Sequence, residues 1–317
     1  MATVMQKTSL LKHKSKREEH KRTLSREDKV FHTINYIVFG LVALICFYPF
    51  YYLFINTISR NDYLDLGLIM FWPEGIHFQN YINIFKLAKI GNAVVISIAR
   101  TILGTASSVL LTTVFAYLFT KPHMKCRKLL YRFTIATMYF SAGMIPGYMN
   151  MKLLGLMNSF WVYIVPKFIA VYNMVLIKTF IESLPPSLEE SAQIDGASYV
   201  QRFARIILPL SKPILATVAL FTAVGQWNSF MDTLLYVSDS NLYPLQFLLY
   251  EYLNQATAIA SSISTMADMS ALDAVTQVSS TAVRNTMTVV TILPIIFVYP
   301  FIQRYYVQGV MIGAVKG

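Results

Sequence analysis

The chain has 317 residues, of which 55% are hydrophobic and only 14% charged, and it carries a formal net charge of +11 with a mean hydropathy of +0.49. This composition is typical of a membrane protein rather than of a large soluble domain. The two cysteines, Cys46 and Cys126, form no disulfide framework and no metal-ligand spacing. A phosphate-binding loop of the form G-x4-G-K-[ST] and a catalytic Ser-His-Asp or Cys-His pattern are also missing from the sequence, so we do not expect an enzyme.

The first 30 residues are rich in charge, and the apolar run that follows them is too long for the core of a cleavable signal peptide. We therefore expect residues 1–30 to form a basic cytoplasmic tail and the first apolar run to remain as a membrane anchor. Residues 31–317 are then predicted to form one transmembrane domain.

Six segments of that domain are apolar enough to cross a membrane. A spanning helix needs roughly 20 mostly apolar residues. Five uncharged runs approach this length, and a sixth is interrupted only by Lys167 and Lys178. In chain order, the six segments are 33–59, 101–120, 133–151, 160–180, 213–231 and 285–303. The sequence predicts an all-α, polytopic membrane protein with six transmembrane helices.

The positive charges orient these helices, because Lys and Arg collect in cytoplasmic loops. With the N-terminus inside, the inside segments contain 20 Lys or Arg and the outside segments five, while Arg100 and Lys167 lie at or within membrane edges. Both termini and the segment 185–213 are then cytoplasmic. Most of the net charge follows from this asymmetry, so we expect contact with anionic lipid headgroups and no nucleic-acid binding.

Polar residues gather at the end of the fifth predicted span, in Gln226, Trp227, Asn228 and Asp232. Polar side chains at membrane depth face a bundle interior or a watery cavity. They are candidates for a substrate pathway, in which the indole would stack on a sugar and the amides would bind hydroxyl groups. The alternative is that they pair with neighbouring helices. A long outside connection, 239–284, follows and begins with a predicted helix over 245–253.

Residues 185–213 are a polar stretch between two predicted spans, with several prolines and a glycine that end or turn helices. We call this stretch the elbow. Pro185 and Pro186 end the preceding helix, and Ser187 and Glu190 have the spacing of a capping box, which predicts a new helix. Gly196 favours a turn.

A second short helix should follow this turn and run to Pro209. In it, Val200 falls on an apolar stripe at helical spacing, and Arg202 faces away from it. The sequence therefore predicts two short helices joined at Gly196.

The elbow resembles a known motif, the EAA loop of membrane subunits of ATP-binding-cassette (ABC) importers. The matching pattern, E-[AS]-A-x3-G-x9-I-x-L-P, consists of Glu190, Ser191, Ala192, Gly196, Ile206, Leu208 and Pro209. The form of the motif with an aspartate before the glycine, here Asp195, resembles that of the carbohydrate branch of the family. The ending, residues 299–317, resembles maltose G-subunit-type permeases, in the subgroup for complex oligosaccharides.

This resemblance implies a type I ABC importer permease fold in a bacterial cell membrane. It implies a second homologous permease, two copies of an ABC ATPase subunit and an extracytoplasmic solute-binding protein as partners. ATP and Mg would be bound by the ATPase, so no cofactor is expected in this chain. The residues expected to dock the ATPase are Glu189, Glu190, Ser191, Ala192, Asp195, Gly196, Arg202, Leu208 and Pro209. The tail residues Gly313, Lys316 and Gly317 are expected near the same interface.

Two other classes of transporter remain open at this point. An ABC permease for a different solute, such as a peptide or an inorganic anion, would keep the elbow and differ in its cavity. A secondary transporter or channel would need no ATPase. The family's sugar-type ending favours a permease that, with a second permease, forms the path of a sugar or oligosaccharide.

Overall fold

The computed structural model describes residues 26–86, 89–254 and 280–314, with side chains described except at 280 and 301–314. The described residues form helices, turns and extended connections, and they contain no β-strand. The chain divides into two compact units, Met1–Leu53 and Phe54–Gly317, and each is described by itself.

The first unit is dominated by α2 (Arg26–Ile58), a 33-residue apolar helix that continues into the second unit and contains Pro49. Glu27 and Asp28 lie in its first turn, where negative charge is favoured by the helix dipole. The first predicted span is therefore helical and begins several residues earlier than expected. The greater part of the predicted tail lies outside the described residues.

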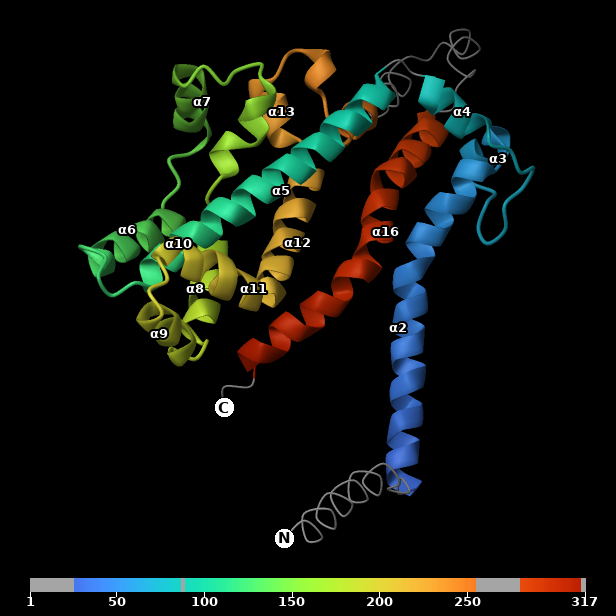
Figure 1. The fold of residues 1–317 in the computed structure, drawn as a ribbon. Helices are drawn as coiled ribbons and strands as arrows, with labels where there is room; N and C mark the ends of the chain where they lie inside the picture. Colours follow the sequence, from blue (N-terminus) through green and yellow to red (C-terminus); the bar gives the residue numbers. More distant parts are fainter. Residues whose placement is uncertain (1–25, 87–88, 255–279, 315–317) are drawn as a thin grey trace. The chain divides into compact units, whose positions relative to one another are not determined.

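The second unit is built on α5 (Ile90–Thr120), α12 (Lys212–Asn228) and α16 (Ser280–Ala314). α12 packs against both α5 and α16 (Figure 1). α8 (Val171–Glu182) packs along the second half of α5. Where α5 meets α12, Gly104 is buried, and this small residue allows the two helices to approach closely.

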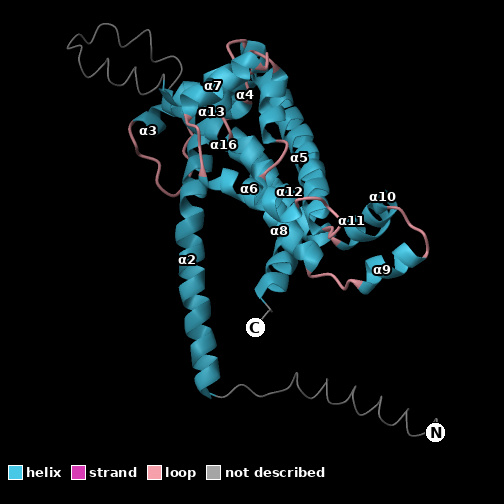
Figure 2. Cartoon of the chain, turned by 90° about the vertical axis from the view of Figure 1, so that its left-hand side faces the viewer, coloured by secondary structure: helices cyan, strands magenta, loops and turns pink. Residues whose placement is uncertain are grey.

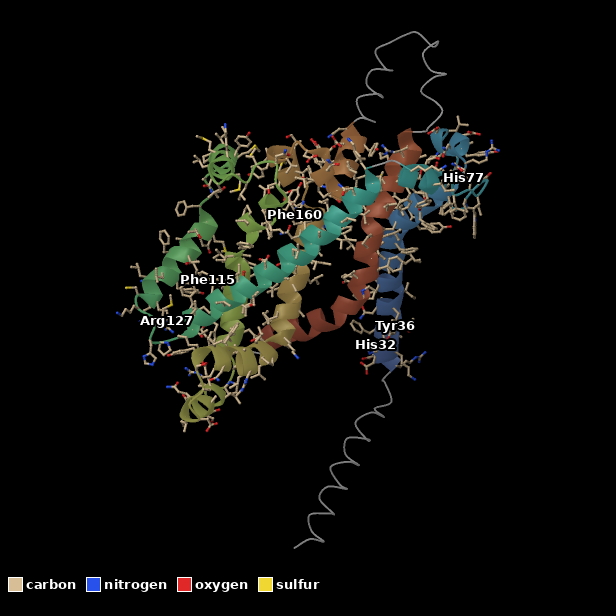
Figure 3. All side chains as sticks on the ribbon, turned by 45° about the horizontal axis from the view of Figure 1, so that its top comes forward. His32, Tyr36, His77, Phe115, Arg127 and Phe160 are labelled. Carbon is tan, nitrogen blue, oxygen red and sulfur yellow. The ribbon has the colours of Figure 1, made fainter. Side chains whose placement is uncertain are left out.

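Shorter elements connect and cover these long helices. They are α3 (Asn61–Asp65), α4 (Gln79–Lys86), α6 (Arg127–Tyr139), α7 (Met144–Leu153), η2 (Phe160–Tyr163), η3 (Val165–Lys167), α9 (Ser187–Ile194), α10 (Tyr199–Arg202), η4 (Phe203–Ile207), α11 (Leu208–Leu210), α13 (Met231–Tyr236) and η5 (Ser240–Leu242). Figure 3 labels Arg127 at the start of α6, where its guanidinium donates to the carbonyl of Thr120 at the end of α5 (3.1 Å).

Within the described residues, three helices are long and apolar enough to cross a membrane, Arg26–Ile58, Ile90–Thr120 and Thr281–Pro300. Two bent pairs raise the number to five, Phe160–Lys167 with Val171–Glu182 (45°) and Tyr199–Leu210 with Lys212–Asn228 (78°). These five correspond to five of the six expected segments. The remaining segment, 133–151, is divided between α6 and α7, which are separated by a connection that contains Gly143 at a φ of +88°.

The helix is interrupted between Lys167 and Val171, and backbone groups at this interruption have no partner within a helix. A side chain of α5 supplies a partner. The hydroxyl of Thr112 accepts a hydrogen bond from the backbone N–H of Ala170 (3.3 Å) and donates to the carbonyl of Phe168 (3.5 Å). Breaks inside membrane segments are tolerated where neighbouring helices satisfy the freed groups. The interruption before α8 is therefore stabilised by specific hydrogen bonds with α5.

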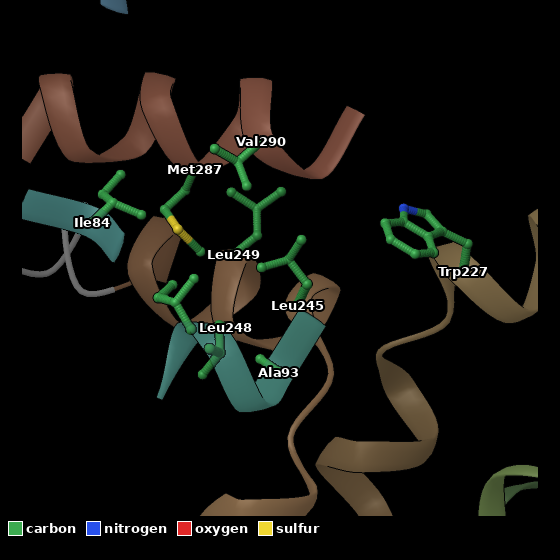
Figure 4. Packing of buried hydrophobic residues seen from close by; sticks show 9 residues of the cluster. Ile84, Ala93, Trp227, Leu245, Leu248, Leu249, Met287 and Val290 are labelled. Atoms are coloured by element: carbon green, nitrogen blue, oxygen red, sulfur yellow. The ribbon is translucent and has the colours of Figure 1, made fainter. Parts of the chain in front are cut away.

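An apolar cluster at one end of the second unit joins α4, α5, α16 and the helical residues 245–254 (Figure 4). Leu245, Leu248 and Leu249 contribute its buried leucines, so the predicted helix over 245–253 is confirmed. The other predicted part of that connection, through residue 279, lies outside the described residues. A second cluster, with Tyr117, Met174 and Ile181, joins α5 to α8 near the elbow.

Candidate functional sites: the elbow and a buried ion cluster

The elbow consists of two short helices, as predicted. α9 runs from Ser187 to Ile194, Gly196 takes the left-handed conformation with a φ of +80°, and α10 begins at Tyr199. Figure 2 shows both helices projecting together from the bundle beside α11. Gly196 thus makes the turn expected from the sequence, because glycine adopts a positive φ at little steric cost.

The capping box predicted at Ser187 is wrong. Pro186 already has helical dihedrals, so Ser187 is the first residue inside α9 and caps nothing with its side chain. A capping box is instead formed one helix later. The backbone N–H of Ser198 donates to Gln201 Oε1 (2.8 Å), and the N–H of Gln201 donates to Ser198 Oγ (3.3 Å).

A π-helical turn, Phe203–Ile207, connects α10 to α11. Pro209 lacks the N–H that would bond the carbonyl of Arg205, so the regular α-helical pattern cannot continue at this point. The chain then bends by 78° into α12. Leu208 and Pro209 of the motif therefore shape the junction between the elbow and the span.

The inner face of α9 is attached to α5 by Glu189. Its Oε1 accepts hydrogen bonds from the hydroxyl of Tyr117 (2.7 Å) and from the ammonium of Lys121, and the guanidinium of Arg202 lies 3.8 Å away. Burial opposes ionisation of Glu189, but the hydrogen bonds from Lys121 and Tyr117 outweigh it and hold the pKa of this carboxyl below its usual value. Glu189 is therefore ionised at neutral pH and ties the elbow to the end of α5.

Arg202 was predicted to face away from the apolar stripe, and this is wrong. It is buried, and its guanidinium donates to Gln193 Oε1 of α9 (2.8 Å) as well as lying near Glu189. Val200, predicted to be on the apolar stripe, is 75% exposed. α10 is only four residues long and is followed by the π-helical turn, so a simple 3.6-residue periodicity does not describe which side faces inward.

Another part of the elbow's surface is exposed, and we call it the elbow face. It consists of Glu190, Ser191, Ile194, Asp195 and Val200. Ile194 is 86% exposed, so two branched apolar side chains stand beside two carboxylates on a protruding surface. Protein–protein contact surfaces combine an apolar centre with a polar rim, and these side chains are compatible with such a surface.

Behind the elbow lies a cavity of about 350 Å³, bounded by the ends of α5 and α8 and by the inner side of α9 and α10. Lys121, Ile181 and Glu189 are among its lining residues, and the exposed Glu190 borders it as well. Beside this space, Glu189 bonds the elbow to the end of α5, and Phe203 and Ile207 pack into the apolar cluster of α5 and α8. Arg202 joins α10 to α9 within the elbow.

Of the predicted tail residues, Gly313 lies in α16, whereas Lys316 and Gly317 lie outside the described residues. Ala192 of the motif is half-buried in α9.

A second polar site lies between the spans and is centred on Arg100 of α5, whose side chain is fully buried (0% exposed). Its guanidinium donates to Asp232 Oδ2 (2.6 Å), to Gln226 Oε1 (3.3 Å) and to the carbonyl of Ser229 (3.0 Å). The ring of Tyr163 lies 4.3 Å from the guanidinium carbon. A buried charge is tolerated only when it is paired and hydrogen-bonded in this way.

Lys167 completes this ion cluster. Its ammonium donates to Asp232 Oδ2 (2.9 Å) and to Ser229 Oγ (3.2 Å), and its side chain is 39% exposed, against 9% for Asp232. We call Arg100, Lys167 and Asp232 the ion cluster. It joins α5, the end of η3 and the start of α13, and the three residues are at least 65 positions apart along the chain.

Of the four residues predicted to line a substrate pathway, three are buried and one is exposed. Gln226 and Asp232 are buried and pair with neighbouring elements, and Trp227 is buried with its indole N–H donating to the carbonyl of Thr291 (3.1 Å). Asn228 is exposed. Sequence reasoning missed Arg100 and Lys167 as members of this site, although two cations inside apolar segments were a signal for a buried counter-ion.

A prediction follows from the contact between Gly104 and Gln226. A Cβ at Gly104 would lie 2.6 Å from Gln226 Nε2 and 2.8 Å from its Cδ. Gln226 cannot move aside freely, because its amide is bonded to Arg100 and to the carbonyl of Tyr163. We expect Gly104→Ala to destabilise the protein by about 1–3 kcal/mol, measured as a lower unfolding temperature in detergent.

Gly225→Ala is the matched control, since Gly225 lies in α12 and a Cβ there would meet nothing within 4 Å. It should be neutral or slightly stabilising, because alanine is a better helix former than glycine. Equal unfolding temperatures for the two variants would contradict the tight contact.

Long apolar helices, two interrupted spans and a polar elbow between spans define an integral-membrane permease. The chain belongs to the family of binding-protein-dependent transport system inner membrane components, whose model matches residues 24–312. It is therefore a bacterial membrane protein and a transport component, not an enzyme.

Comparison with individual proteins agrees with this family. The chain is 36% identical to protein LplC of Bacillus subtilis (strain 168) over 95% of this chain and 99% of that protein. It is 33% identical to the polygalacturonan/rhamnogalacturonan transport system permease YtcP of the same organism, over 92% and 100%. A crystal structure of a bacterial ABC transporter involved in the import of the acidic polysaccharide alginate matches with a TM-score of 0.78 and 28% identity, over 89% of this chain and 98% of that chain. The predicted type I ABC importer permease fold is confirmed.

Proposed function

We propose that the chain is one permease subunit of an ATP-driven importer and forms, with a second homologous permease, the path of an oligosaccharide. The relatives transport polygalacturonan or rhamnogalacturonan, or belong to an importer of alginate, which supports a sugar substrate. The same family supports two ATPase subunits and an extracytoplasmic binding protein as partners. ATP and Mg would be bound by the ATPase subunits.

The single observation that carries this proposal is the two-sided geometry of the elbow. Its inner side is fixed to α5 by Glu189, and its elbow face exposes Ile194 and Glu190. Such a surface is suited to docking a soluble partner, which here is the ATPase. The excess of Lys and Arg supports a cytoplasmic location for the elbow and for both termini.

The mechanism follows from these contacts. When the two ATPase subunits close on ATP, they move the docked elbows. Glu189 of the elbow passes this movement to Tyr117 and Lys121 at the end of α5. α5 packs on α8 and α12, so the bundle tilts with it. The path then opens alternately to the two sides of the membrane while the sugar is handed over from the binding protein.

The test is affinity purification of tagged wild-type chain from its native membrane. We expect to recover an ATPase and a second permease with it, and uptake of sugar should stop when ATP is depleted. Recovery of the chain alone, with continued solute movement without ATP, would instead favour a secondary transporter or channel. An ATP-dependent complex that transports peptides or inorganic anions and no sugar would favour the other alternative.

The turn at Gly196 yields a further prediction. Its φ of +80° is rarely adopted by residues with a side chain, although the space around it is open. We expect Gly196→Val to strain the turn by about 1–3 kcal/mol, to displace the elbow face and to reduce ATP-driven uptake at normal membrane levels. Uptake per membrane-inserted chain is the measurement.

Gly196→Asn is the matched variant, because asparagine tolerates the left-handed region far better than valine. It should keep most of the uptake. Unchanged uptake in Gly196→Val would exclude a mechanical role for this turn.

A further inference from the structure

The ion cluster has an imbalance of charge. Arg100 and Lys167 each carry a positive charge, and the ion pairs of both, in the part of the chain that the structure describes, are made to the single carboxylate of Asp232. The cluster therefore has one positive charge more than it has negative charges. In a partly desolvated site such an excess attracts an anion much more strongly than it would in water.

Lys167 is the member through which the excess charge can be reached. The guanidinium of Arg100 is fully buried, whereas the side chain of Lys167 is 39% exposed. An ammonium has three N–H donors, and Lys167 uses two of them, toward Asp232 and Ser229. One donor thus remains for a ligand.

The location of Lys167 is also suited to a ligand. It is the last residue of η3, immediately before the interruption that precedes α8. Ser229, its other partner, follows the end of α12, and the neighbouring Asn228 is exposed. Two helices end at this level, and interrupted helices at membrane depth are accepted where they line a cavity.

We propose that Lys167 binds a carboxylate of the transported oligosaccharide, so that this permease moves uronate-containing sugars in preference to neutral ones. The inference rests on the proposed function and deepens it. Asp232 holds the ammonium of Lys167 in place but is also bound to Arg100 at 2.6 Å, so it does not neutralise both cations. A substrate carboxylate supplies the missing charge, and a neutral sugar can offer only uncharged hydroxyl groups to the same ammonium.

The experiment measures uptake in the native strain of two labelled uronate trimers, trigalacturonate and trimannuronate. Their carboxyl-reduced neutral forms, galactotriose and mannotriose, are measured beside them. We expect wild type to take up at least one uronate trimer faster than its neutral form. Lys167→Met should lower that uptake about tenfold or more, the size expected from loss of one charge-assisted hydrogen bond. Lys167→Arg, which keeps the charge, should retain uptake within about threefold of wild type.

Lys178→Met is the matched control, since Lys178 is also ion-paired, to Glu182 at 2.7 Å, and lies in the adjoining α8. It should not change the preference for uronates. The membrane level and the co-purified ATPase are measured for every variant, and Lys167→Gln replaces Lys167→Met if the latter is not inserted.

Faster uptake of the neutral forms, or equal losses in the Lys167 and Lys178 variants, would overturn the inference. Uptake of neither class by a complex that does contain the ATPase would also overturn it, while the proposed function would stand. Absence of the ATPase from the purified complex is the separate result that contradicts the proposed function.

Discussion

Asp232→Ala is expected to destabilise the protein by about 3–5 kcal/mol, because it leaves the fully buried guanidinium of Arg100 without a counter-ion. Burial removes the guanidinium from water, so the lost pairing cannot be replaced by solvation. The expected observations are a strongly reduced amount of chain in the membrane and a lower unfolding temperature of what remains in detergent.

The double variant Arg100→Leu with Asp232→Leu should recover most of this loss. Replacing a buried ion pair by apolar residues of similar volume is often neutral or stabilising. Lys167 would then lose its partner but is exposed enough to be solvated. The double variant thus separates the cost of an unpaired charge from the cost of changing shape.

The matched control is Asp62→Ala, which breaks the ion pair between Asp62 and Arg60. The side chain of Asp62 is 69% exposed and that of Arg60 is 55% exposed. Exposed pairs contribute about 0–1 kcal/mol, so this variant should behave nearly as wild type. If Asp232→Ala is as mild as Asp62→Ala, the ion cluster does not hold the helices together.

Glu190→Ala and Glu189→Gln should have different effects, although the two residues are adjacent. Glu190 belongs to the elbow face, and losing an anchor of an interface costs about 2 kcal/mol, or roughly thirtyfold in affinity. The ATPase should therefore be largely lost from purified Glu190→Ala. Glu189→Gln should retain the ATPase and lose uptake, because Glu189 bonds to Lys121 and Tyr117 of its own chain and, in the proposed mechanism, these bonds transmit the movement.

The measurements are the amount of co-purified ATPase per chain and ATP-driven uptake per inserted chain. Glu182→Ala is the control, since its carboxylate pairs only with Lys178 among the contacts described and is partly exposed. It should change neither quantity. Identical behaviour of the Glu189 and Glu190 variants would contradict the division between the two sides of the elbow.

The elbow was predictable because its signals are local. Pro185, Pro186 and Gly196 fix where helices end and turn through the backbone alone, and the motif spacing lies within 20 residues. The side of the elbow that faces the bundle was not predictable. Glu189 is fixed by Tyr117 and Lys121, which are 72 and 68 residues away, and no local pattern contains that pairing.

The same reason explains the ion cluster. Periodicity and length placed five of the six apolar segments on helices or bent helix pairs, but Arg100 and Asp232 are 132 residues apart, so their contact is a property of packing. Arg100 was therefore placed at a membrane edge when its side chain is the most buried charge of the described residues. Segment 133–151 was predicted as one span, whereas the structure divides it into α6 and α7 at a connection that contains Gly143.

The two adjacent glutamates have an evolutionary consequence. Because Glu190 is exposed whereas Glu189 is bonded to Tyr117 and Lys121, the elbow face can change without disturbing the attachment to α5. A permease can then acquire or share a different ATPase by substitutions in a handful of outward positions. In a collection of homologous sequences, Glu189 should covary with Tyr117 and Lys121 inside the same chain, whereas Ile194 and Val200 should covary with residues of the ATPase gene.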